Sequence, residues 1–395
     1  MRGLAQNPAL LCVYRALMMS LFPMAVLTVF YERQIGMSLL EIMVLQGAFG
    51  LAMVCFEFPS GFLADRLGYR FSLMAASLLH VVGWALYANS STFTEIAIAE
   101  ALLGVGTSLI SGCDSALLYE SLLESGQEAR YTVWMGRFQS SGQVAEGVAA
   151  LAAGALFFWW PPSVFWLEVL LWVVNFGIAY RMVEPARHRP PGSESWSQIK
   201  AIVRHAFIEA PRLRAVFLLA IILGMSTFLP VWMIQLYAVD AGVPDVWLGV
   251  IWAIANFCVA LGALASNYLE TRFGFARILA LCAVMLLVGF GGLGFSYAIY
   301  GCAFYFVLTL MRGINGPIVS HREQRFVPSS DRAGFLSLRS LVFRLTFLVV
   351  GPLTGWLALR WGQHPTMLLL GFVFAALVLV MRQVIKSQDQ AAADS

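Results

Sequence analysis

The chain has 395 residues, of which 60% are hydrophobic and 12% carry a charge, and its mean hydropathy is +0.77. A soluble fold of that length does not bury so much apolar side chain, so the composition excludes an ordinary soluble protein and indicates a membrane protein. The net charge of +3 is distributed along the chain without a single basic face, which argues against nucleic-acid binding.

Apolar runs of about 20 residues recur along the chain, and each is long enough to cross a bilayer as a helix. The first half carries runs near residues 10–31, 38–60, 71–89, 93–119, 131–158 and 163–183. The second half repeats the rhythm near 214–239, 246–268, 277–297, 299–320, 334–358 and 365–381. We therefore predict an all-α integral membrane protein with twelve transmembrane helices in two pseudo-symmetric six-helix bundles.

The predicted bundles span residues 1–184 and 214–395, and a polar linker over 185–213 joins them. Within the linker, Ser195 and Gln198 have the spacing of a helix capping box. Apolar residues then recur at helical spacing against basic ones, as in Trp196, Ile199 and Lys200. This pattern predicts an amphipathic helix lying on the inner membrane surface.

Basic residues gather in alternate loops, in the linker and at the C-terminus, and the opposite loops carry little beyond Arg33 and Arg360. Because cytoplasmic loops are enriched in Arg and Lys, both termini are predicted to be cytoplasmic. Arginine almost entirely replaces lysine, a bias typical of GC-rich bacterial genomes. We therefore expect a multi-pass protein of a bacterial inner membrane.

A short charged segment follows the second run and reads Gly61-Phe-Leu-Ala-Asp65-Arg66-Leu-Gly68-Tyr-Arg70. Its glycines allow close backbone approach or positive φ, so the segment predicts a tight loop between two membrane helices. It resembles the signature of the major facilitator superfamily, Gly-x-x-x-Asp-Arg-x-Gly-x-Arg, at every position. A weaker echo over residues 269–277 follows the second run of the other half, as expected of duplicated bundles.

The resemblance implies transport by alternating access and a gating role for the motif. In the superfamily the motif's Asp closes the cytoplasmic side by pairing with helix-end amides and with a basic residue of the opposite bundle. Carried over, Asp65 is this lock, Arg66 or Arg70 its partner within the bundle, and Arg339 a candidate from the second bundle. The alternative is that Arg66 and Arg70 only anchor the topology.

Ionisable residues inside the bilayer are costly, so each needs a partner, water or a function. In the fourth run, Glu100, Thr107, Ser111 and Asp114 fall on one face of an ideal helix. In the fifth run, Gln139, Gln143 and Glu146 form a second polar stripe. Glu146 is our first candidate for the proton carrier, Asp114 the second, and Glu100 a further one.

Arginines are concentrated in the second half, where Arg312 and Asn315 share a face of the tenth run and Arg344 lies in the eleventh. Together with Arg15 of the first run and Gln143, they are candidates for binding the solute, because guanidinium stays charged and offers a planar set of donors. The alternative is that these arginines form permanent structural ion pairs, Arg15 with Asp114 and Arg312 or Arg344 with Glu146.

We predict a secondary active transporter that exports a drug or an amphipathic metabolite in exchange for protons, since aromatic residues, Met and few charges favour loose recognition. The alternatives are an uptake permease for an organic anion or siderophore-like compound, and a non-transporting membrane sensor or scaffold on the same fold. Two differences from the pattern of the superfamily's proton-coupled exporters weaken the case for drug antiport. Glu100 stands where proton-coupled exporters carry Arg, and the fifth run lacks their Gly-Pro pair.

Neither an enzyme nor a cofactor or metal site is expected, because no nucleophile–base pair, phosphate loop or metal-ligand spacing is present in the sequence. Without a nucleotide-binding Gly-x-x-x-x-Gly-Lys-Ser/Thr motif, the driving force must be an ion gradient. The expected partners are a small-molecule solute, protons and the lipid bilayer, and we expect a monomer.

Overall fold

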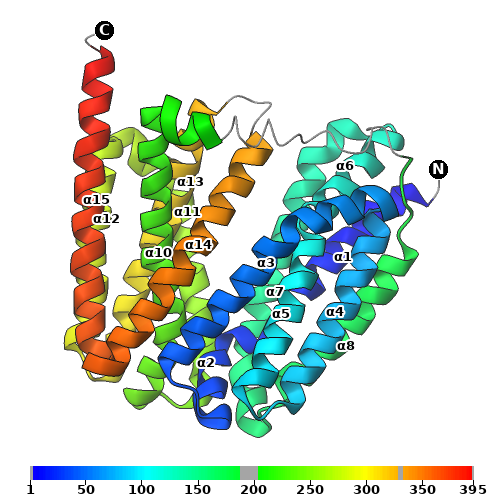
Figure 1. Ribbon diagram of the computed structural model, residues 1–395, viewed down its shortest axis with the longest axis horizontal. Helices are drawn as coiled ribbons and strands as arrows, with labels where there is room; N and C mark the ends of the chain where they lie inside the picture. The colour runs from blue at the N-terminus through cyan, green and yellow to red at the C-terminus, as the bar shows by residue number, and fades with distance from the viewer. Residues whose placement is uncertain (1–2, 187–202, 328–331, 394–395) are drawn as a thin grey trace. The chain divides into compact units, whose positions relative to one another are not determined.

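The computed structural model describes residues 3–186, 203–327 and 332–393, and these form helices joined by short turns (Figure 1). Within the described residues, twelve helices are long and apolar enough to cross a membrane. This confirms the predicted all-α membrane fold. In chain order the first half contains α1 (Asn7–Met19), α2 (Leu27–Phe30), α3 (Leu39–Leu67), α4 (Tyr69–Asn89), α5 (Phe93–Ile110), α6 (Cys113–Glu124), α7 (Tyr131–Trp159) and α8 (Ser163–Arg181).

Among its described residues, the second half contains six long helices: α10 (Pro211–Asp240), α11 (Leu248–Phe273), α12 (Phe275–Phe295), α13 (Cys302–Phe326), α14 (Arg332–Trp361) and α15 (Gln363–Ala393). A short helical turn, His205–Glu209, precedes α10. The predicted amphipathic linker helix falls mostly on residues 187–202, which lie outside the described residues.

The chain divides into two compact units. Unit 1 contains Met1–Met37, Val44–Ser193 and Asp245–Ala253. Unit 2 contains Ser38–Met43, Glu194–Pro244 and Ile254–Ser395.

Unit 1 has a core of buried aromatic side chains shared by α1, α4 and α8. Trp172 of α8 meets the ring of Tyr14 edge-on at 6.1 Å, and the imidazole of His80 stacks on Trp172 at 3.8 Å. Both Tyr14 and Trp172 are almost completely buried. Such ring pairs add about 0.5–1.5 kcal/mol each beyond the burial of their area, and they fix the three helices against one another.

The first membrane segment is discontinuous, although the sequence predicted one helix over 10–31. α1 ends at Met19, a 3₁₀ turn occupies Phe22–Ala25, and α2 begins at Leu27. Pro23 lies at the start of this turn, where its missing N–H is tolerated. The backbone N–H of Phe22 donates to Oε1 of Glu168 on α8 at 3.1 Å, so a buried carboxylate supports the break.

The fourth membrane segment is also broken, between α5 and α6. Gly112 adopts a φ of 81°, a left-handed conformation that favours glycine, and Ser111 turns away from helical geometry with ψ of 114°. The span predicted over 93–119 is present, but it consists of two helices and not of one continuous helix. The polar stripe predicted from Glu100 to Asp114 is divided, because Asp114 belongs to the first turn of α6.

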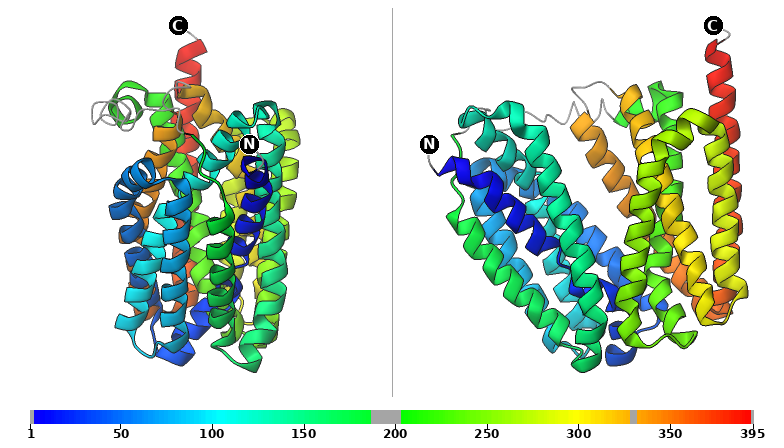
Figure 2. Two further views of the ribbon diagram at one scale, coloured as in Figure 1. Left: turned by 90° about the vertical axis from the view of Figure 1, so that its right-hand side faces the viewer. Right: turned by 180° about the vertical axis from the view of Figure 1, so that it is seen from behind.

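Unit 2 is built around α10, in which 20 of the 30 residues are buried. α12 and α15 lie side by side along their length (Figures 1 and 2), and Phe290 stacks on Phe374 between them. Pro317 lies inside α13 and has no N–H to donate the usual hydrogen bond to the carbonyl of Gly313. α10, α13 and α14 pack around the cavity described below.

Candidate functional site

The motif that the sequence predicted as a loop is mostly helical. α3 continues through Gly61 and Arg66 to Leu67, and α4 begins at Tyr69, so Gly68 alone joins the two helices. Gly68 has a φ of 108°, which a residue with a side chain rarely adopts. The prediction of a ten-residue hinge was wrong because charge and glycine also suit the end of a helix that leaves the membrane.

Glu184, just beyond α8, caps the start of α4. Its Oε1 and Oε2 accept hydrogen bonds from the backbone N–H groups of Tyr69 and Arg70, each at 2.8 Å. A Cβ on Gly68 would lie 2.7 Å from Cδ of Glu184, so this position needs glycine for space as well as for φ. A carboxylate at a helix N-terminus pairs with free amides and with the positive end of the helix dipole.

The motif's arginines contact neighbouring aromatic rings. Arg66 lies over Phe62 at 4.5 Å from the ring centroid. Arg70 lies 5.1 Å from the ring of Tyr180 and donates to its backbone carbonyl at 2.6 Å. The side chain of Asp65 is outside the described part of the chain. Its predicted pairing with Arg66, Arg70 or Arg339 therefore stays a prediction.

A cavity of about 370 Å³ lies inside unit 2 between α10, α13 and α14. Two residues predicted to bind the solute, Arg312 and Asn315, line it from α13. Arg339, predicted as a gating residue, lines it from α14. The structure therefore brings together three of the residues singled out in the second half.

One wall of this cavity is aromatic. Phe228 of α10 and Phe343 of α14 meet at 5.5 Å with an interplanar angle of 67°. Phe343 fits against α10 because Gly224 leaves room, since a Cβ there would lie 2.8 Å from Cε2 of Phe343. The other side offers hydrogen-bonding groups from Thr227 and Asn315. Ligand sites commonly combine an apolar wall with a few polar groups in this way.

The two arginines of the cavity differ in their partners. Arg339 Nη1 lies 2.6 Å from Oε2 of Glu323, whose side chain is only 2% exposed. No carboxylate lines the cavity, and Arg312 forms no ion pair among the described residues. Arg312 is therefore a cation inside a membrane span that lacks a protein counter-ion within the described chain.

Glu100 is held by donors from three neighbouring elements of unit 1. Its Oε1 accepts from the hydroxyls of Tyr31 at 2.9 Å and Tyr87, and from Nε2 of Gln46 at 2.9 Å. The two tyrosine hydroxyls are 2.7 Å apart. All four side chains are buried, so the cluster is a closed hydrogen-bond network.

Arg15 and Asp114 are neighbours, as the ion-pair alternative predicted. Arg15 Nη1 lies 3.9 Å from Oδ2 of Asp114, and the guanidinium is 5.2 Å from the ring of Phe138. Asp114 also accepts from the backbone N–H of Ser115 at 2.6 Å, at the start of α6. Arg15 packs against Gly142 of α7, where a Cβ would lie 3.2 Å from its Cγ.

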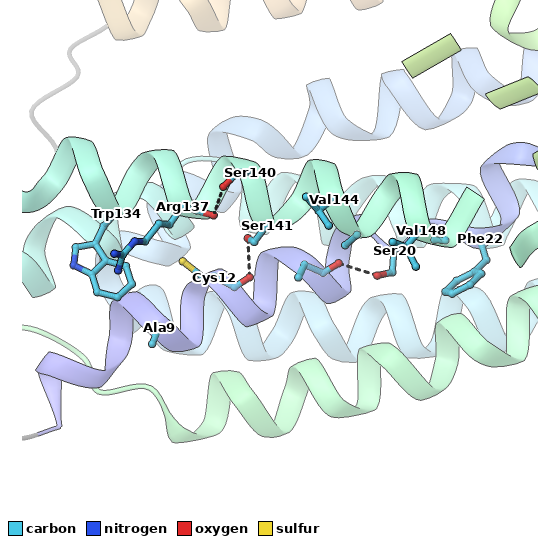
Figure 3. A pocket seen from close by; sticks show the side chains of 13 residues that line it. Ala9, Cys12, Ser20, Phe22, Trp134, Arg137, Ser140, Ser141, Val144 and Val148 are labelled. Carbon is cyan, nitrogen blue, oxygen red and sulfur yellow. Dashed lines mark hydrogen bonds between the residues drawn. The ribbon is translucent and has the colours of Figure 1, made fainter. Parts of the chain in front are cut away.

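The remaining candidates lie apart from these groups. Gln143 and Glu146 are on α7, exposed and half-buried respectively, and Arg344 is half-buried on α14 outside the cavity lining. A groove between α1 and α7 is lined mainly by small residues, with Arg137 stacked on Trp134 at 4.9 Å at one end (Figure 3). Neither Gln143 nor Glu146 lines it.

Sequence reasoning missed Glu323 because the tenth run was ended at 320. α13 in fact continues to Phe326, and residues 312, 316, 319 and 323 then share one helical face. Extending the predicted helix by about two turns would have placed Glu323 on the same helical face as Arg312. The aromatic partners of Glu100 carried no comparable signal, because buried tyrosines in apolar helices are ordinary packing residues.

Comparisons with known proteins agree on one family. The sequence matches the family model of the Major Facilitator Superfamily over residues 9–345. No curated protein matches the sequence. Among solved structures, a mutant of the nucleoside transporter NupG superposes with a TM-score of 0.79 at 12% identity, covering 98% of this chain and 99% of that one.

Two further structures are similar over almost the whole length. The POT family transporter PepTSo gives a TM-score of 0.76 at 13% identity, covering 99% of this chain and 98% of that one. A bacterial homologue of the human lysosomal transporter Spinster, inward-facing and unoccupied, gives a TM-score of 0.72 at 13% identity, covering 98% of this chain and 97% of that one. At such low identity these likenesses show the fold. Together with the family match over most of the sequence, they establish that the chain belongs to the Major Facilitator Superfamily and is a membrane transporter, not an enzyme.

Proposed function

We propose that the chain is a proton-coupled secondary transporter of a small organic anion with an apolar or aromatic part, bound in the cavity of unit 2. The observation that carries this proposal is Arg312, a cavity-lining guanidinium with no ion pair among the described residues. A charge inside a membrane span needs compensation, and a solute anion supplies it. Arg also offers a planar set of donors to a carboxylate or phosphate.

The aromatic wall supports an amphipathic solute. Phe228 and Phe343 present ring surface opposite the polar residues, so a ring or short apolar chain has a place to pack while its anionic group reaches Arg312. The cavity volume of about 370 Å³ fits a small molecule. Transporters of nucleosides and of the POT family share this fold.

Export of a neutral or weakly charged drug or metabolite is the second candidate. It is favoured by the apolar character of the α10 wall, which includes Ile221, Leu223 and Phe228. Cationic drugs are disfavoured in this cavity, because the unpaired charge of Arg312 would repel them.

The candidates for the residue that carries the coupling proton are carboxylates of unit 1. Asp114 is the first of them on structural grounds, because its contact with Arg15 at 3.9 Å is loose and it lies at the break between α5 and α6. Broken membrane helices are common at ion and solute sites of transporters. Glu100, with its three donors, and Glu146 are the others.

Transport into proteoliposomes tests the proposal. Purified protein is reconstituted with an imposed pH gradient of either sign, and uptake of organic acids, neutral aromatic compounds and cationic drugs is measured. We expect proton-driven flux of aromatic acids that Arg312→Gln abolishes. Arg277→Gln, a change on exposed α12 surface, is the matched control.

The same assay separates the alternatives. Flux of neutral compounds that is insensitive to Arg312→Gln would favour the export candidate. A chain that binds these compounds without moving them would point to the sensor. Loss of proton drive in Asp114→Asn, with binding retained, identifies that residue as the coupling group.

We also propose a monomer in a bacterial inner membrane with both termini in the cytoplasm, on the strength of the alternating basic loops. A C-terminal green fluorescent protein fusion should fluoresce, and a C-terminal alkaline phosphatase fusion should be inactive. Light scattering of the detergent-solubilised chain measures the oligomeric state.

A further inference from the structure

The charge of the unit 2 cavity can be counted from its residues. Arg312 and Arg339 line it, and no acid does. Glu323 lies outside the lining on the same helix as Arg312, buried to 1% exposure, and its Oε2 meets Arg339 at 2.6 Å. The carboxylate therefore cancels the charge of Arg339, and the site retains one uncompensated positive charge, that of Arg312.

Glu323 has no second charged partner among the described residues. Among the described residues, Glu323 makes its ion pair with Arg339 alone, and its Oε1 has no hydrogen-bond partner. Arg322, its neighbour in sequence, pairs instead with Glu270 and Asp389. Arg277 and Cys282 of α12 form neither an ion pair nor a hydrogen bond with Glu323, and the cavity wall of α10 has no ionisable side chain.

We propose that Glu323 is a specificity-determining residue that sets the charge of the transported anion, by balancing Arg339 so that the cavity accepts a monovalent anion and disfavours a divalent one. A monoanion at Arg312 leaves the site neutral. A dianion leaves one negative charge without a partner in the site, which is unfavourable. This inference rests on the proposed function of the cavity and narrows its solute class.

Glu323 acts through Arg339, because it is buried and does not line the cavity. It is therefore a positioning residue with an electrostatic effect, and the two roles need separate readouts. Glu323→Gln preserves an oxygen that accepts from Arg339 and nearly preserves the volume, but it raises the net charge of the site by one. A loss of positioning weakens every anion alike, whereas a change in site charge alters the ratio between a monoanion and a dianion.

The experiment uses a probe pair that differs in charge and little in shape. Phenyl sulfate is a monoanion, and phenyl phosphate is mostly a dianion at about pH 8. Binding of both to the full-length protein in detergent is measured by calorimetry, with benzenesulfonamide as a neutral probe. We expect the wild type to prefer the sulfate by about tenfold or more, and Glu323→Gln to reverse or abolish this preference.

Three other variants make the outcome unambiguous. Glu270→Gln removes an acid of the same unit that pairs with Arg322 outside the cavity, and it should leave the preference unchanged. Arg312→Gln should remove binding of both anions and spare the neutral probe. If Glu323→Gln does not fold, Arg339→Gln gives the complementary test, because the cavity then has no net charge and the phosphate should weaken more than the sulfate, relative to the neutral probe.

The failures are distinguishable. If neither anion binds the wild type, or Arg312→Gln leaves anion binding intact, the proposed function fails and this inference fails with it. If the sulfate binds through Arg312 but Glu323→Gln shifts both affinities by the same factor, the cavity function stands and the role of Glu323 is overturned. A wild-type preference for the phosphate also overturns it.

Discussion

Glu168 and Phe22 are joined by a hydrogen bond of 3.1 Å from the backbone N–H of Phe22 to Oε1 of the carboxylate. Glu168 is fully buried, and the indole N–H of Trp172 approaches it without hydrogen-bond geometry. The carboxylate thus satisfies a backbone amide that the break after α1 leaves free.

Replacing Glu168 by Leu should destabilise unit 1, because the amide of Phe22 then has no acceptor. We expect a loss of about 1–3 kcal/mol, measured as lower thermal stability in detergent. Glu168→Gln keeps an acceptor oxygen and should lose less. Equal stability of the Leu variant and the wild type would show that the hydrogen bond is not needed to hold the break.

Glu184 should protect two amides from hydrogen exchange. In the wild type, the N–H groups of Tyr69 and Arg70 donate to separate carboxylate oxygens of Glu184. The variant Glu184→Gln retains only one acceptor oxygen for these two N–H groups. Exchange at one or both amides should become faster, by mass spectrometry of the full chain. Glu124→Gln is a matched control, since Glu124 accepts from the nearby backbone N–H of Ala186 at 2.7 Å. Unchanged exchange in Glu184→Gln would contradict the cap.

The Glu100 network should show strong coupling in a double-mutant cycle. Tyr87→Phe removes one donor and is expected to cost about 1–2 kcal/mol of unfolding free energy. Glu100→Ala removes the shared acceptor and strands the buried donors, so it should cost more. The double variant should lose little beyond Glu100→Ala, because the contact is already gone. Additive losses would mean that the two side chains act independently.

Gly224→Ala should impair solute binding more than stability. The added Cβ would lie 2.8 Å from Cε2 of Phe343, a flexible ring that can move, and the ring lines the cavity. We expect about fivefold weaker binding of an aromatic anion, since a lost ring contact is worth roughly 1 kcal/mol. Gly291→Ala, where nothing lies within 4 Å of the new Cβ, is the matched control. Unaltered affinity in Gly224→Ala would show that Phe343 does not contact the solute.

Exchanging Arg15 and Asp114 tests whether they are a simple ion pair. A simple pair survives the exchange, but Asp114 also accepts from Ser115 at the start of α6, where negative charge is favoured. We therefore expect the exchanged double variant to stay less stable than the wild type. The neutral double variant Arg15→Gln with Asp114→Asn is the reference. Full recovery of thermal stability in the exchanged variant would show that Arg15 and Asp114 form a simple structural ion pair.

The fold was predictable because the bilayer imposes a length on each span. Runs of about 20 apolar residues translate directly into helices, and the structure contains twelve such spans within its described residues. The residues at which helices end were harder to predict. α3 and α13 continue for one or two turns beyond the apolar runs, since a helix that has left the hydrocarbon can carry charged residues such as Arg66 and Glu323.

The breaks in the first and fourth segments could not be predicted from hydropathy. A window average remains high across Ser20–Val26 and across Ser111 and Gly112, because the residues at the breaks are small or apolar. What permits each break is distant in sequence or specific to the backbone. Glu168 reaches Phe22 from α8, and Gly112 supplies the positive φ.

The cavity was predictable in part. Arg312 and Asn315 were recognised because polar residues in a membrane helix need a reason to be there. Glu146 and Arg344 fit the same rule and yet do not line the cavity, since helical periodicity gives a face but not the neighbour that this face meets. The role of Phe228 depends on its meeting with Phe343, which only tertiary structure reveals.

Because Gly68 alone separates α3 from α4, the length of the chain at this turn is fixed. Connections at membrane surfaces usually tolerate inserted residues, epitope tags or protease sites. Here a single insertion would rotate the first turn of α4 and carry the amides of Tyr69 and Arg70 away from Glu184. Length variation among relatives of this protein should therefore be absent at residue 68, even where the surrounding residues change.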